Sequence, residues 1–136
     1  MTALTEFLFP APAHRSTGQI LRWWESRRLP YNLMVGSAGV FSLVFVRLVS
    51  MLPPGASGLP FHMPWIPIAV FAGLANICYL LGPTVEVITE KLWGRQVLPV
   101  GPALFRMGLT FSVGLALLPT LLVLLAWVYR IVVAVV

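Results

Sequence analysis

Three long apolar runs divide the chain, and polar or basic residues separate them. The runs cover about residues 31–52, 65–81 and 103–127. A helix needs roughly 20 mostly apolar residues to cross the ~30 Å hydrocarbon core of a bilayer, and each run is near that length. The pattern therefore predicts an all-α integral membrane protein with three transmembrane helices. The second helix is expected to extend past the membrane to about Lys91.

The last run leaves two alternatives open. The apolar pattern continues from Ala103 to Val136, which as one helix would be about 51 Å long at 1.5 Å per residue. Either this helix spans to about Trp127 and its end protrudes, or Pro119 breaks it and Thr120 starts a fourth span. Proline commonly only kinks a membrane helix, and the residues around Pro119 include none that favour a turn. Three spans are therefore favoured.

Residues 1–30 are predicted to form a separate cytoplasmic segment ahead of the transmembrane region, 31–136. Ser16 and Gln19 have the spacing of a capping box, which predicts a helix from Thr17 to Arg28. Pro30 is expected to end that helix and turn the chain into the first span.

This N-terminal helix is predicted to be amphipathic and to lie in the headgroup plane. Its apolar side carries Trp23 and Trp24, opposite Arg22 and Glu25. We expect the two tryptophans to dip into the acyl boundary as a membrane anchor. The alternative is that they dock a partner protein.

Basic residues predict the orientation, because they favour the cytoplasmic side of a membrane. The loop between residues 52 and 64 has no Lys or Arg, and the C-terminal tail has only Arg130. The bases of the other two segments are Arg15, Arg22, Arg27 and Arg28, and then Lys91, Arg95 and Arg106. We therefore expect a bacterial inner-membrane protein with its N-terminus in the cytoplasm and its C-terminus outside.

Composition supports membrane embedding. Apolar residues make up 59% of the chain and charged residues 10%, against about 25% charged in soluble domains. The net charge of +5 does not indicate nucleic-acid binding, since the bases cluster at the ends of the apolar runs. No cleavable signal peptide is expected. The single cysteine, Cys78, excludes an internal disulfide and is expected to be a small packing residue.

The sequence contains little that indicates catalysis. His14 and His62 are predicted to lie on opposite sides of the membrane, so they cannot form a metal pair. His62 is a weak candidate ligand for a haem or a chlorophyll-type magnesium and is better interpreted as a wet interfacial side chain. Neither the ligand set of a zinc site nor a nucleotide-binding glycine pattern is present. We expect no enzyme activity, metal or cofactor.

A few polar residues lie in or beside the predicted spans. Arg47 is close enough to the outer face to extend its charge into water. Asn76 is expected to bond to a neighbouring helix, and Tyr79 lies close to it. Glu86 and Glu90 share one face of a helix and are expected to pair with Lys91, Arg95 or Arg106.

Small residues four positions apart indicate close helix packing. Such pairs are Ala69 with Gly73, Gly108 with Ser112, and Thr110 with Gly114. They are expected to pack within the three-helix bundle or to meet a partner.

Three sequence stretches carry a resemblance. The chain has Trp-Trp-Glu-Ser-Arg-Arg-Leu-Pro-Tyr-Asn at 23–32, Ala-Asn-Ile-Cys-Tyr at 75–79 and Gly-Pro-Thr-Val-Glu at 82–86. Over about residues 20–115 it resembles small bacterial multipass proteins with no assigned activity. The resemblance implies a helical membrane protein and leaves the activity open.

The favoured function is a non-catalytic accessory or scaffolding subunit of a larger membrane complex, with energy-converting and photosynthetic complexes among the candidates. The expected partners are the lipid bilayer and other membrane subunits. The alternative is a protomer of an oligomeric transporter or channel, whose path would be lined by Arg47, Asn76, Tyr79 and Glu86. A lipid enzyme that uses Glu86 or Glu90 is the least favoured class.

Overall fold

All regular secondary structure in the described part of the chain is helical. A computed structural model describes residues 3–10, 16–55, 64–94 and 100–135. The helices are α1 (Ala3–Leu8), α2 (Thr17–Ser50), α3 (Trp65–Trp93) and α4 (Gly101–Val135), with no strand in these ranges. The predicted all-α class is confirmed.

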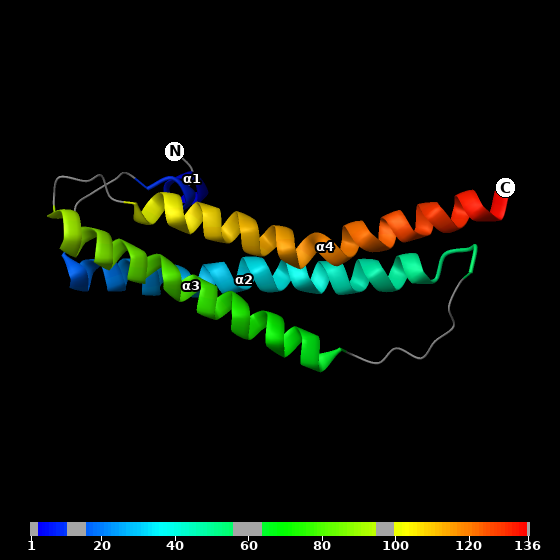
Figure 1. Cartoon of the computed structure of the whole chain (residues 1–136), viewed down its shortest axis with the longest axis horizontal. Coiled ribbons are helices and arrows are strands. Elements are labelled where there is room, and N and C mark those ends of the chain that lie inside the picture. The colour runs from blue at the N-terminus through cyan, green and yellow to red at the C-terminus, as the bar shows by residue number, and fades with distance from the viewer. Residues whose placement is uncertain (1–2, 11–15, 56–63, 95–99, 136) are drawn as a thin grey trace.

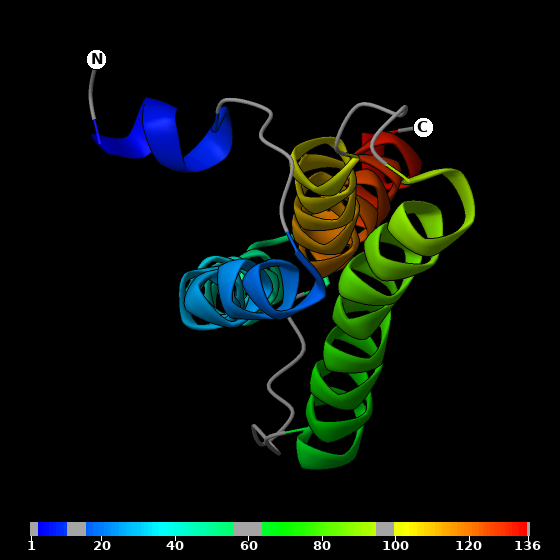
Figure 2. The same ribbon diagram turned by 90° about the vertical axis from the view of Figure 1, so that its left-hand side faces the viewer.

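The three long helices form an up-down-up arrangement (Figure 1). α2 and α4 run in the same direction and lie side by side, while α3 runs in the opposite direction. α3 lies close to the other two helices through its C-terminal half and diverges from them toward Trp65. Figure 2 views α2 and α4 end-on and shows that α3 is inclined to them. The arrangement therefore has a tightly packed end, where α3 finishes and α4 begins, and an open end.

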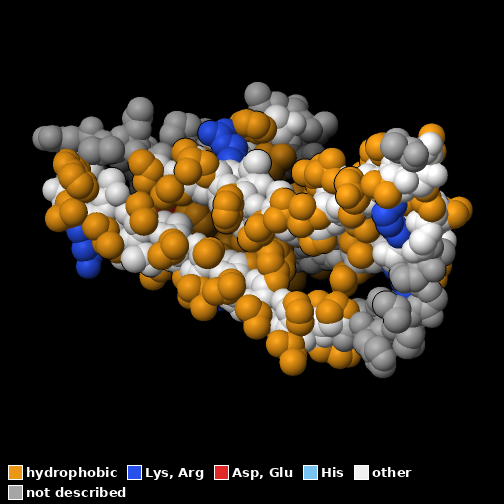
Figure 3. Space-filling view, turned by 45° about the vertical axis from the view of Figure 1, so that its right-hand side comes forward, with side chains coloured by type: hydrophobic (Ala, Val, Ile, Leu, Met, Phe, Trp, Pro, Cys, Tyr) orange, Lys and Arg blue, Asp and Glu red, His pale blue; other side chains and the backbone are white. Residues whose placement is uncertain are grey.

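All three long helices are long and apolar enough to cross a membrane. Their outer surfaces are covered by apolar side chains (Figure 3); Ile66, for example, is 79% exposed and Phe111 is 67% exposed. In water such surfaces would drive aggregation, whereas in a bilayer they face lipid tails of equal polarity. The chain is a multipass membrane protein with three spanning helices.

α4 continues without interruption through Pro119 for 35 residues. The alternative of a fourth span beginning at Thr120 is therefore wrong. The C-terminal part of α4 is joined to the turn that follows α2 by two hydrogen bonds. The Trp127 indole donates to the Pro53 carbonyl over 3.2 Å, and Arg130 donates to the Gly55 carbonyl over 3.1 Å.

α2 begins at the predicted capping box. The Ser16 backbone N–H donates to the Gln19 side-chain oxygen over 3.0 Å. The helix then continues to Ser50 with Pro30 inside it, so the expectation that Pro30 ends a separate helix is wrong. The buried residues Trp24 and Tyr31, on either side of Pro30, pack into one interhelical core and keep the two parts of the helix in line.

The short helix α1 lies beside the beginning of α4 (Figure 1). Its Phe7 ring meets the Phe105 ring edge-on, with centroids 5.5 Å apart. The Arg27 guanidinium lies 5.1 Å from the centroid of Phe7 and 3.9 Å from that of Trp23. Aromatic and cation–π contacts therefore hold α1 against the packed end.

Candidate functional site

The packed end contains a buried aromatic and polar cluster that joins the three long helices. We call it the Trp24 cluster; its members are Trp24, Tyr31, Tyr79, Gly82, Glu86, Gly101, Phe105 and Ser112.

Trp24 of α2 is the centre of this cluster and is 3% exposed. Its indole N–H donates to a Glu86 carboxylate oxygen over 2.6 Å, and its backbone carbonyl accepts a hydrogen bond from the Tyr79 hydroxyl over 2.5 Å. Its ring lies directly on Gly82, where an added Cβ would overlap the indole. One residue of α2 therefore holds three positions of α3. The expectation that Trp24 anchors the chain in the headgroup plane is wrong, because its ring is used inside the protein, while Trp23 is half-buried beside it.

Tyr31 links all three helices through one hydroxyl. It is 2% exposed, and its oxygen lies 3.2 Å from the Ala75 carbonyl and 2.7 Å from the Ser112 hydroxyl. A phenol has a single proton. That proton serves one of the two contacts at a time, and either hydroxyl can be the donor between Tyr31 and Ser112. This chain of hydrogen bonds runs from α4 through α2 to α3.

Glu86 is a carboxyl group 5% exposed. It lies against Gly101, the first residue of α4, where an added Cβ would overlap its carboxylate. The first backbone N–H groups of a helix have no partner inside the helix, and this end of the helix dipole stabilises negative charge. Glu86 therefore joins the α2 indole to the N-terminus of α4.

Asn76 bonds to a neighbouring helix, as predicted. Its amide nitrogen donates to the Asn32 side-chain oxygen over 3.1 Å, and Asn32 donates back over 3.4 Å. The pair is half-buried between α2 and α3. Such amide pairs stabilise helix association in a membrane because lipid offers no alternative partner.

Charged groups at this end make several other contacts. Glu90 accepts a hydrogen bond from the Thr17 hydroxyl over 3.3 Å, and the Arg106 guanidinium lies 4.8 Å from the centroid of Phe9. Lys91 is exposed. Arg95 lies outside the described residues, so its predicted pairing with Glu86 or Glu90 stays a prediction.

The small-residue pairs face outward, apart from Ser112. A Cβ added at Gly73, Gly108 or Gly114 would meet nothing within 4 Å, and Ala69 is exposed. The expected packing inside the bundle is therefore found for Ser112 but not for the open glycines, and the alternative that these residues meet a partner stays a prediction. The reason is that α3 packs through another face, whose buried residues are Ala75, Tyr79, Pro83 and Glu86. Their spacing turns Ala69 and Gly73 away from α2 and α4.

The other residues to which the sequence analysis gave a role are not members of the Trp24 cluster. Cys78 is exposed, which contradicts its expected packing role. Arg47 is half-buried in the last turn of α2. His14 and His62 lie outside the described residues, so the weak ligand role of His62 stays a prediction.

Sequence reasoning named Tyr79 and Glu86 but missed Gly82, Gly101 and Tyr31 as contact points. Two signals were present. Gly82 and Gly101 each precede a proline, and Tyr79 and Glu86 lie seven positions apart, which places them on the same face of a helix.

The cluster has the chemistry of a structural joint. Each hydroxyl, amide and carboxylate described above is within hydrogen-bond reach of a group on another helix. Within the described ranges, no group of three His, Cys, Asp or Glu side chains is placed to hold a metal ion.

Comparison with protein-family models, curated proteins and solved structures gave no match.

We predict that Gly82→Val destabilises the bundle. The added side chain overlaps the Trp24 ring, and overpacking of a core contact lowers the free energy of unfolding by about 1–3 kcal/mol. Unfolding in a detergent titration, followed by circular dichroism, measures this change. Gly73→Val is the matched control on the same helix, because its Cβ meets nothing within 4 Å. Equal losses in the two variants would contradict the close contact.

We also predict energetic coupling between Trp24 and Glu86. Trp24→Phe retains a ring over Gly82 but removes the donor to a buried carboxylate, which destabilises by about 1–3 kcal/mol. Adding Glu86→Gln to this variant should cause a smaller loss than Glu86→Gln causes in the wild type. A double-mutant cycle on detergent unfolding measures the coupling. Trp93→Phe, at a position 59% exposed, is the control, and strictly additive losses would show that the bond contributes nothing.

Proposed function

We propose that this protein is a non-catalytic accessory or scaffolding subunit of a larger complex in a bacterial inner membrane. The main support is the open, small-residue face of α3. The N-terminal half of this helix stands away from α2 and α4 (Figure 1) and carries Ala69 and Gly73 on its exposed side. Ala69 has only a methyl group and Gly73 has no side chain, so the backbone of a partner helix can approach closely there.

The chemistry of the packed end also supports a structural role. The polar residues considered for a transport path make hydrogen bonds between helices. Tyr79 donates to the Trp24 carbonyl, Glu86 accepts from the Trp24 indole, and Asn76 pairs with Asn32. Opening a path along these groups would break the contacts that hold α3 in place. These bonds therefore favour a scaffold over the transporter alternative and over a lipid enzyme using Glu86.

The proposed partner is a membrane protein that supplies at least one transmembrane helix. Lipid tails are as apolar as a leucine side chain, so helix association in a bilayer depends on close packing and hydrogen bonds. The surface around Ala69 and Gly73 offers the first of these. A partner helix with its own small residues at four-residue spacing is the complementary surface.

The proposed orientation places the packed end in the cytoplasm. Arg22, Arg27, Arg28, Lys91 and Arg106 belong to this end, since they lie near the start of α2, the end of α3 and the start of α4. Clustered bases beside membrane helices favour the cytoplasmic side.

We predict that the two connections lie on opposite sides of the membrane. In a Cys78→Ser background, Ser57→Cys should react with a membrane-impermeant maleimide added outside spheroplasts. Gln96→Cys should react only after the membrane is permeabilised. Labelling of Gln96→Cys alone in intact spheroplasts would reverse the orientation, and labelling of both would contradict the three-span topology.

Gly73→Leu tests the subunit proposal. A leucine at Gly73 should separate the helices of the complex, so that a larger membrane partner no longer copurifies in mild detergent. Gly36→Leu is the matched control, because Gly36 is also exposed and a Cβ there meets nothing within 4 Å. Copurification is measured by mass spectrometry of affinity-purified material.

Two results would contradict the proposal. One is an unchanged set of partners in Gly73→Leu. The other is an Asn76→Ala variant that assembles normally but loses an ion or solute flux measured in proteoliposomes, which would favour the transporter alternative.

A further inference from the structure

The uncharged stretches of the three long helices are offset from one another along the bundle. Two hydrogen-bonded pairs of short side chains fix the register of the helices. Asn76 of α3 donates to Asn32 of α2 over 3.1 Å, and the Thr120 hydroxyl of α4 donates to the Ser42 hydroxyl of α2 over 3.0 Å. Height along the helices is counted from the Asn32–Asn76 pair, at about 1.5 Å per residue and positive toward the open end.

α2 and α4 are uncharged over similar heights. On α2 no charged residue lies between Arg28, at about −6 Å, and Arg47, at about +22 Å. On α4 none lies between Arg106, at about −6 Å, and Arg130, at about +30 Å. Trp127 of α4 lies at about +25 Å. Because a bilayer has a hydrocarbon core of about 30 Å, the limits on α2 match the two surfaces of one core.

α3 is uncharged over a range that is shifted toward the packed end. The helix begins at Trp65, at about +16 Å, and its first charged residue is Glu86, at about −15 Å. Its apolar stretch is therefore also about 30 Å long, but each limit lies about 6–9 Å nearer the packed end than on α2 and α4. Tryptophans are enriched at membrane–water interfaces, and Trp65 and Trp127 mark two different heights.

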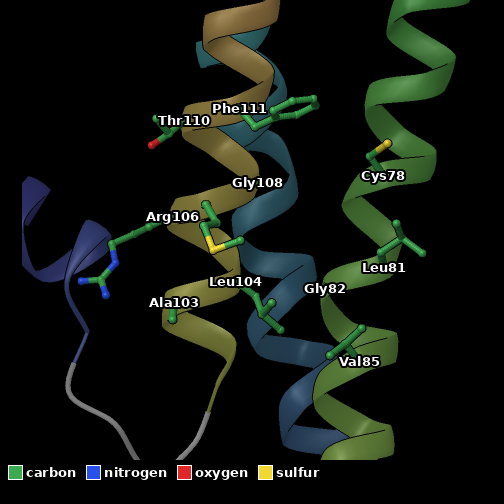
Figure 4. A pocket seen from close by; sticks show the side chains of 11 residues that line it. Cys78, Leu81, Gly82, Val85, Ala103, Leu104, Arg106, Gly108, Thr110 and Phe111 are labelled. Atoms are coloured by element: carbon green, nitrogen blue, oxygen red, sulfur yellow. The ribbon is translucent and has the colours of Figure 1, made fainter.

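The side chains at the packed end agree with this shift. Leu81 and Val85 of α3, at about −8 and −13 Å, are exposed apolar residues that line a groove between α3 and α4 (Figure 4). The Arg106 side chain turns away from α3 toward α1 (Figure 4), and its guanidinium lies over the Phe9 ring. At the level where α2 and α4 carry charge, α3 therefore presents an apolar surface.

We propose that the bilayer surrounds this protein along an oblique belt, so that α3 lies closest to the membrane normal while α2 and α4 cross at an incline. α3 diverges from the other two helices toward the open end (Figure 1). A bilayer perpendicular to α3 therefore meets α3 nearer the packed end than it meets α2 and α4, which is the direction of the offset. All three uncharged stretches then lie in one hydrocarbon layer.

An inclined crossing also suits the lengths of the helices. α2 has 34 residues and α4 has 35, and helices longer than the hydrocarbon core tilt at a modest cost in free energy. With α2 and α4 upright, Val85 would leave the hydrocarbon while Trp65 would remain inside it. The chain would then join α3 within the lipid, where backbone groups without hydrogen bonds are costly. The belt concerns lipid contact alone, so it does not depend on the proposed subunit role.

Depth measurements by electron paramagnetic resonance test the incline in the full-length protein, reconstituted in dioleoylphosphatidylcholine vesicles. Single nitroxide labels are placed at exposed positions in a Cys78→Ser background, and their collisions with oxygen and with a water-soluble nickel chelate give their depth. Ile66 of α3 and Phe41 of α2 are both exposed and have nearly the same height, about +15 and +13 Å. The Ile66→Cys label should nevertheless lie about 6–9 Å shallower than the Phe41→Cys label.

A second pair tests the packed end, where the order is reversed. Thr84 of α3 lies at about −12 Å and Ser26 of α2 at about −9 Å, and both are exposed. In an upright bundle the Thr84→Cys label would lie closer to water, whereas the oblique belt places it about 6 Å deeper than the Ser26→Cys label.

Three results would overturn the proposal. Depths that follow the heights in both pairs would show an upright bundle. A shift in one pair alone would indicate local deformation of the bilayer rather than an incline. A label at Ile66→Cys that is shielded from both oxygen and the nickel chelate would indicate that protein, and not the membrane surface, covers that end of α3.

Discussion

The contact between Trp24 and α3 is the interaction on which the packed end depends. A bilayer gives helices no hydrophobic reason to associate, so close packing and hydrogen bonds must supply the attraction. Trp24 provides both, since its ring rests on Gly82 and its N–H and carbonyl bond to Glu86 and Tyr79. Tyr31 then extends the same joint to α4 through Ser112. Beyond this joint α3 has little to hold it, and it diverges (Figure 1).

The packed end and the divergent end differ in what they do. The packed end holds the three long helices together, and the divergent end is open to lipid or to other helices. Tyr31, Tyr79 and Glu86 form hydrogen bonds at the joint, while Gly73, Gly108 and Gly114 of α3 and α4 remain open. When polar groups form hydrogen bonds inside the protein, the surface that faces lipid or other helices is apolar. Places on such a surface differ mainly in shape. Specificity on such a surface comes from where side chains are missing, as at Gly73 and Gly108.

The sequence was sufficient to predict the number of spans, the capping box at Ser16 and the cross-helix bond of Asn76. It did not predict which face of each helix points inward. In a soluble helix the polar stripe marks the outer face, but a helix that is apolar all round carries no such mark. The interior was therefore one of the two positions expected for Ala69 and Gly73, although the inward face of α3 carries Tyr79 and Glu86. Pro30 was also misjudged, because contacts distant in sequence hold the parts of α2 before and after it in one helix.

The position of Glu86 links the start of α4 to the two long helices that precede it in the chain. The residue before α4 is Val100, which has no side-chain oxygen to cap a helix, and unsatisfied N–H groups are costly away from water. The carboxylate at the start of α4 comes instead from α3, which is made earlier and is itself positioned by α2. The first turn of α4 therefore lies against a carboxylate from another helix. A substitution that displaces Trp24 or α3 would also move this negative charge away from the N-terminus of α4.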